Sequence, residues 1–161
     1  MTEHPFALAA LIVAHDATEL DADTLASIAR TAIELGALPV VVALPPGVEV
    51  PPGVRVVRTR PGGAPTLALR LGMAQLTNTT ARAVLLHPLR GAQPPLDALL
   101  ALLDAAKRAD DAIVAFAVDS LDDAPVMVPR DAWLELVTLA EGGLDALATR
   151  RRVQRVDARP S

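Results

Sequence analysis

The sequence predicts an α/β fold in which helices cover both faces of a mainly parallel sheet. Apolar runs of strand length alternate with amphipathic helical stretches along all 161 residues, and this alternation is typical of right-handed crossovers between parallel strands. The strand-like runs are continuously apolar, as in strands that are buried on both faces. Repeats and linkers are not apparent. We therefore expect one three-layer, Rossmann-like α/β/α domain spanning residues 1–161.

Seven segments are predicted to be strands. The first, residues 7–14, is an apolar run bounded by polar residues, and residues 38–44 have the same character. Prolines at 45, 46, 51 and 52 then favour a stiff extended connection. The expected strands cover residues 7–14, 38–44, 54–58, 83–88, 112–118, 125–128 and 153–156.

Helices are predicted between most of these strands. Apolar residues at helical spacing indicate a helix that begins near Asp21 or Asp23 and ends before Gly36. Pro94 and Pro95 open another helix, which continues to about residue 108, since proline suits a first helical turn. The remaining expected helices cover residues 66–76, 131–141 and about 144–151.

Composition excludes several classes of function. A net charge of −4 does not fit a nucleic-acid-binding surface. The absence of cysteine excludes disulfides and thiolate metal sites. The first apolar run is too short to cross a bilayer and lacks the basic start of a signal peptide. We expect a cytoplasmic protein that contacts neither nucleic acid nor membrane.

Candidate site residues follow from the expected sheet. Ligands of such sheets bind beyond the carboxyl ends of the strands, near a reversal of strand order. Polar residues at or just past those ends are the ligand-binding candidates: His15, Asp16, His87, Arg90, Asp119 and Asp122. The two histidines and an aspartate suit zinc or iron, but loop residues that shape turns explain the same pattern. We assign no catalytic residue and no metal site.

Four segments taken in order resemble the MobA-like nucleotidyltransferases, which include the molybdenum-cofactor cytidylyl- and guanylyltransferases. Residues 66–76 (TLALRLGMAQL) match a SLRAGLAAL-like stretch of the family, and residues 83–89 (AVLLHPL) match its metal-binding strand end. Residues 124–130 (APVMVPR) correspond to a GHPV-like segment, and residues 141–147 (EGGLDAL) to a GDxGxRxLL-like helix start. The resemblance covers roughly residues 65–150 and implies a nucleotide-diphospho-sugar-transferase-like domain.

The chain departs from that family where its chemistry resides. The family loop LAAGxSxRMGxxK follows the first strand, whereas this chain has no Gly, Arg or Lys among residues 1–29 and carries acids such as Asp16 and Glu19 there. Polyphosphate binding needs cations and close backbone N–H groups, so this segment is unsuited to it. At the implied Mg²⁺-binding aspartate the chain offers His87 or Arg90, and neither is a ligand that Mg²⁺ prefers.

The motifs and their departures together predict a nucleotidyltransferase-like domain that has lost catalysis and acts as a binding or interaction module. We expect no cofactor, a ligand that the sequence does not identify, and a protein partner or a second copy of the chain. The alternative is an active transferase that acts on a molybdopterin-like or other small substrate with a nucleoside triphosphate and Mg²⁺.

Overall fold

The computed structural model describes residues 6–14, 22–47, 49–60, 65–89, 93–109, 111–138 and 143–157. Seven strands form one sheet in the order β3-β2-β1-β4-β6-β5-β7. The strands are β1 (Leu8–Val13), β2 (Ala37–Leu44), β3 (Arg55–Arg58), β4 (Ala83–Pro88), β5 (Ile113–Phe116), β6 (Val126–Pro129) and β7 (Val153–Val156). All seven predicted strands are therefore confirmed, with ends that differ by one or two residues.

Most of the sheet is parallel. Strand β1 pairs in parallel with both β2 and β4, and β5 pairs in parallel with β7. The exception is β6, which runs antiparallel to β4 on one side and to β5 on the other. The sheet is therefore mixed, and the prediction of a mainly parallel Rossmann-like sheet is confirmed.

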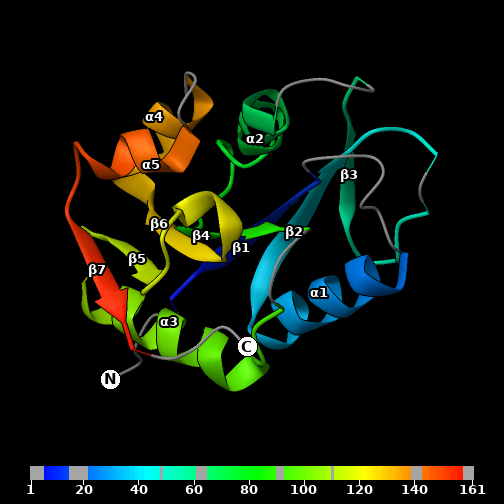
Figure 1. The fold of residues 1–161 in the computed structure, drawn as a ribbon. Helices are drawn as coiled ribbons and strands as arrows, with labels where there is room; N and C mark the ends of the chain where they lie inside the picture. The colour runs from blue at the N-terminus through cyan, green and yellow to red at the C-terminus, as the bar shows by residue number, and fades with distance from the viewer. Residues whose placement is uncertain are drawn as a thin grey trace.

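Helices form a layer on each face of this sheet (Figure 1). One layer contains α1 (Ala22–Glu34) and α3 (Leu96–Arg108), and the other contains α2 (Pro65–Ala74), α4 (Trp133–Val137) and α5 (Gly143–Ala148). Two short 3-10 helices, η2 (Leu121–Asp123) and η3 (Arg130–Ala132), flank β6. In the described part of the chain, no helix is long and apolar enough to cross a membrane.

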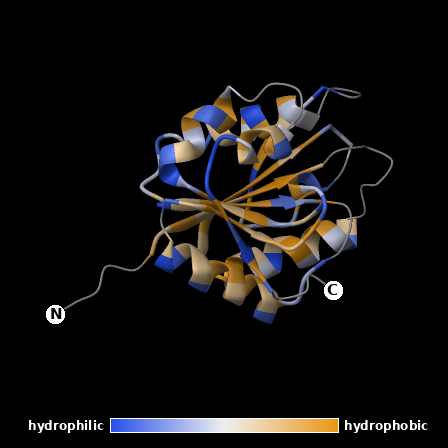
Figure 2. Ribbon diagram, turned by 60° about the vertical axis from the view of Figure 1, so that its left-hand side comes forward, coloured by the Kyte–Doolittle hydropathy of each residue, from blue (hydrophilic) through white to orange (hydrophobic). Residues whose placement is uncertain are grey.

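The core consists of two apolar clusters, one on each side of the sheet. Successive residues of β4 point into different clusters: Leu85 faces α1 and α3, and Leu86 faces the other layer. Figure 2 shows hydrophobic strands between helices whose outer faces are hydrophilic. On α3, Leu99, Leu102 and Leu103 are buried and Leu100 is 42% exposed, so the helix hides three of the four leucines at its centre.

Candidate functional site

The candidate site lies where β1 and β4 end side by side. Their register pairs Ile12 with His87 and Val13 with Pro88, so the carboxyl ends of both strands meet at one edge of the sheet. From β1 the chain continues to β2 on one side, while β4 lies on the other side. This is the reversal of strand order at which open α/β sheets bind ligands.

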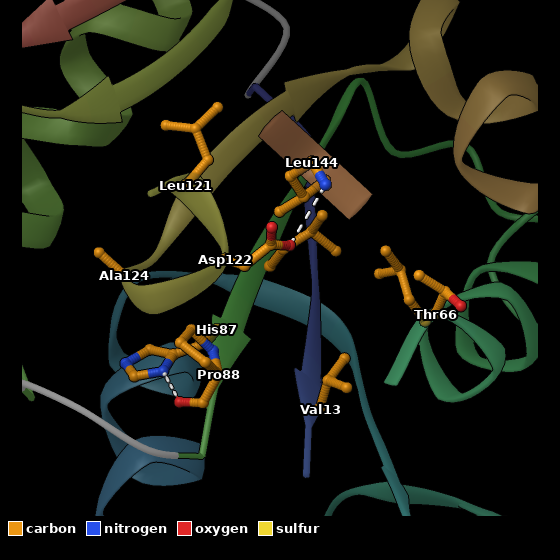
Figure 3. A pocket seen from close by; sticks show the side chains of 10 residues that line it. Val13, Thr66, His87, Pro88, Leu121, Asp122, Ala124 and Leu144 are labelled. Carbon is orange, nitrogen blue, oxygen red and sulfur yellow. Dashed lines mark hydrogen bonds between the residues drawn. The ribbon is translucent and has the colours of Figure 1, made fainter. Parts of the chain in front are cut away.

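A small pocket opens at this edge (Figure 3). Its cavity volume is about 40 Å³. The pocket is bounded by Val13, Thr66, Leu69, Leu86, His87, Pro88, Leu121, Asp122, Ala124 and Leu144. Six of these residues are aliphatic, and Asp122 is the one carboxylate among them. The described lining contains no lysine or arginine, so it offers no side-chain cation to a phosphate group.

Asp122 reaches the pocket from η2 and also holds the start of α5. Its Oδ1 accepts a hydrogen bond from the backbone N–H of Leu144 at 3.2 Å, which satisfies one of the donors that a helix N-terminus leaves unpaired. In return, Asp145 of α5 accepts hydrogen bonds from Ser120 Oγ at 2.6 Å and from the Leu121 N–H at 2.8 Å. We call this arrangement of Ser120, Asp122 and Asp145 the η2–α5 clasp; it fixes one wall of the pocket.

His87 occupies the end of β4, but its ring turns away from the apolar pocket (Figure 3). As on any strand, its side chain shares a face with Leu85, which is the face covered by α1 and α3. The ring is only 4% exposed, and its Nδ1 lies 2.7 Å from the carbonyl oxygen of Pro88. Burial lowers the pKa of His87 to about 4, with the hydrogen bond to Pro88 opposing the shift. The imidazole is therefore neutral at pH 7.

The predicted site residues divide into three groups. His87, near the end of β4, and Asp122, in η2, both border the pocket. Asp119 is exposed and is not part of the pocket wall. His15, Asp16 and Arg90 lie outside the described residues.

The described side chains do not fit a Mg²⁺ ion at the pocket. Mg²⁺ requires oxygen ligands in near-octahedral geometry, and Asp122 supplies the only carboxylate of the described wall while it holds α5. Within the described ranges, no group of three or more His, Cys, Asp or Glu residues is placed to hold a metal ion. His87 is one of the two residues, with Arg90, that the family resemblance aligns with the expected aspartate, and its imidazole faces the other side of the sheet.

Two residues of this edge, Ser120 and Asp145, have roles that the sequence did not indicate. The Ser120 hydroxyl donates to Asp145 and accepts from the Asp122 N–H at 3.3 Å, so it caps η2. The role of Asp145, the third residue of α5, could not be predicted from the sequence, because its partner Leu121 lies 24 residues away. Such pairings depend on the tertiary contact between η2 and α5.

No protein-family model matches the sequence, and no curated protein matches it. The structure nevertheless has the fold of the nucleotide-diphospho-sugar transferases, a Rossmann-like α/β/α architecture. Likeness to solved structures establishes this fold across nearly the whole chain.

Three solved structures illustrate the likeness. Rv0371c from Mycobacterium tuberculosis H37Rv in complex with manganese has a TM-score of 0.70 at 19% identity, covering 95% of this chain and 90% of that one. A 4-diphosphocytidyl-2C-methyl-D-erythritol synthase has a TM-score of 0.67 at 18% identity, covering 99% and 92%. A CMP:2-keto-3-deoxy-manno-octonic acid synthetase in complex with CTP has a TM-score of 0.61 at 13% identity, covering 94% and 90%.

Proposed function

We propose that this chain is a nucleotidyltransferase-fold domain that no longer performs metal-dependent nucleotidyl transfer and instead serves as a binding or interaction module. The observation that carries the proposal is the state of His87. His87 and Arg90 are the two residues that the resemblance aligns with the carboxylate presented to Mg²⁺, and His87 is a buried, neutral imidazole that faces α1 and α3.

The character of the pocket supports the same proposal. Its described wall is mainly aliphatic and bears one negative charge, at Asp122. A triphosphate carries several negative charges, which need cations or aligned N–H donors to replace their hydration. In the sequence, the segment that follows β1 contains acids such as Asp16 and Glu19 and has no Arg or Lys before Arg30. A polyphosphate is therefore a poor ligand for this edge.

The second candidate is an active transferase that uses a rearranged site. It is favoured by the fold shared with a synthetase whose structure contains CTP and with a protein whose structure contains manganese. A molybdopterin-like substrate and an association with molybdenum-cofactor synthesis are proposals that depend on the family resemblance alone. A protein partner or self-association belongs to the first candidate, and light scattering measures the latter.

Isothermal titration separates the two candidates. The full chain is titrated with CTP and with GTP, each with Mg²⁺ and again with Mn²⁺, and pyrophosphate release is measured in parallel. The binding-module proposal predicts no metal-dependent heat in the micromolar range and no pyrophosphate. Saturable, metal-dependent binding with a micromolar Kd would favour the transferase.

A further inference from the structure

His87 is the one polar or charged side chain that is buried in the described part of the chain. A buried polar group without a structural reason is informative, because burying it costs free energy unless its hydrogen bonds are made. The bond from Nδ1 to Pro88 accounts for one ring nitrogen. The other nitrogen, Nε2, has no hydrogen-bond partner among the described residues.

The protonation state of each ring nitrogen follows from these contacts. A carbonyl oxygen only accepts hydrogen bonds, so Nδ1 must carry the proton that it shares with Pro88. A neutral imidazole has one N–H, which leaves Nε2 as a bare acceptor. No fully buried side-chain nitrogen or oxygen of the described residues lacks a partner, so Nε2 is not sealed in the core.

His87 also borders a crevice between α1 and the start of α3. This crevice lies on the face of the sheet opposite to the apolar pocket. Its cavity volume is about 200 Å³. Its polar groups are the hydroxyls of Ser27 and Thr31, the amide of Gln93 and the imidazole of His87. Ile28 and Leu99 add apolar surface. The described wall has no charged side chain.

We infer that this crevice is a binding site for a small, uncharged molecule that carries several hydroxyl groups, one of which donates a hydrogen bond to Nε2 of His87. Thr31 Oγ1 already donates to the Ser27 carbonyl oxygen at 3.0 Å, so its oxygen is oriented to accept a bond from a ligand. The Gln93 amide supplies both a donor and an acceptor.

The class of ligand follows from the polar groups that the described wall presents. A cation would find no carboxylate among the described wall residues, and an anion would find no guanidinium or ammonium group. Hydroxyl groups match the inventory, because each one donates to a lone pair such as that of Nε2 and accepts from another group. This inference goes beyond the proposed function, because it concerns a different cavity and does not depend on the fate of the nucleotide site.

The test uses D-glucose as probe, with gluconate and glucosamine as anionic and cationic molecules of similar size. Long-range ¹H–¹⁵N spectra of the full chain at pH 7 report the tautomer of His87 and any change at Nε2. We expect a protonated Nδ1 in the free protein and a saturable shift of Nε2 with glucose that is larger than with either charged molecule.

Two variants locate the site. His87→Leu removes the acceptor and should weaken glucose binding about tenfold, the effect of losing one well-placed buried hydrogen bond. Thr31→Val alters the crevice wall and should also weaken glucose binding. It tests the site independently of whether His87→Leu folds. Thr138→Val is the matched control, because Thr138 makes the same kind of bond to the Leu134 carbonyl oxygen, at 3.1 Å, on α4.

Several outcomes would overturn the inference. These are an Nε2–H tautomer in the free protein, the absence of a saturable shift, equal responses to glucose and its charged analogues, or unchanged binding in Thr31→Val. None of these results bears on nucleotide binding, which the titration with CTP and GTP measures separately.

Discussion

Gly143 packs directly against the carboxylate of Asp122. A Cβ atom at position 143 would lie 2.9 Å from both carboxylate oxygens, and the backbone there has a φ of +58°. Glycine adopts this conformation without a steric penalty and leaves room for the acceptor that holds α5. The η2–α5 clasp therefore depends on a missing side chain as well as on hydrogen bonds.

Gly143→Ala should destabilise the protein by about 2 kcal/mol, because it adds backbone strain and crowds Asp122. Urea denaturation gives the change in the free energy of unfolding. Asp122→Ala removes the crowded group, so Gly143→Ala should cost about 1 kcal/mol less in that background. Additive effects of the two substitutions would show that the contact has no energetic weight.

Gly72 sets the distance between α2 and β1. A Cβ there would come within 2.4 Å of Leu11 Cδ1, and Leu11 is fully buried. Gly72→Ala should destabilise the protein by about 1 to 3 kcal/mol through overpacking, although alanine is the better helix former. The matched change is Ala101→Gly, at a partly exposed position of α3, where alanine should be preferred by about 1 kcal/mol. A stabilising Gly72→Ala would mean that α2 is free to shift.

His87 should make stability depend on pH. Its pKa falls from 6.5 to about 4 on folding, so the unfolded chain binds a proton between these values and the folded chain does not. The contribution of His87 to the free energy of unfolding is complete above pH 6.5. It is lost as the pH falls towards 4, by on the order of 3 kcal/mol in total. His87→Leu should reduce the loss of stability between pH 7 and pH 4 relative to the parent chain. Identical pH profiles would contradict a neutral, buried imidazole.

Arg130 stabilises the loop between α2 and β4. Its guanidinium donates to the carbonyl oxygens of Thr77 at 2.8 Å, Thr79 at 2.6 Å and Ala81 at 3.1 Å, and it stacks over the Trp133 ring at 4.3 Å. Lysine cannot reproduce this planar set of donors, so Arg130→Lys should cost about 1 kcal/mol.

Urea denaturation followed by the fluorescence of Trp133, the one tryptophan, measures that change. Arg150→Lys is the control, because the Arg150 side chain is exposed and makes no hydrogen bond or ion pair with the described residues; its effect should stay within about 0.5 kcal/mol. Equal effects of the two substitutions would contradict the role of Arg130.

The sequence predicted the architecture because apolar periodicity determines which segments are buried. The runs at residues 7–14 and 83–88 became the central strands β1 and β4 with almost unchanged ends. A buried indole N–H needs a hydrogen-bond partner, and that of Trp133 donates to the Val128 carbonyl oxygen at 3.1 Å. The antiparallel direction of β6 was not predicted, because direction depends on pairing with β4 and β5 rather than on local pattern.

The candidate site was predicted only in part. His87 and Asp122, two of the candidate residues chosen because they lie at or past strand ends, both border the pocket; that they bind a ligand there stays a prediction. The sequence did not predict that the His87 ring would face α1 and α3, which depends on the side-chain alternation along β4 and therefore on its register. It also gave no sign of the clasp between Asp122 and α5, because neither partner lies near the other in sequence.

The central claim is that the edge beyond β1 and β4 no longer accepts a metal–nucleotide complex. Titration of the full chain with CTP or GTP in the presence of Mg²⁺ or Mn²⁺ tests it most directly. We expect that micromolar nucleotide releases no heat that depends on the metal. Adding a chelator should therefore leave the measured heat unchanged. A micromolar Kd that disappears when the metal is chelated would contradict the claim.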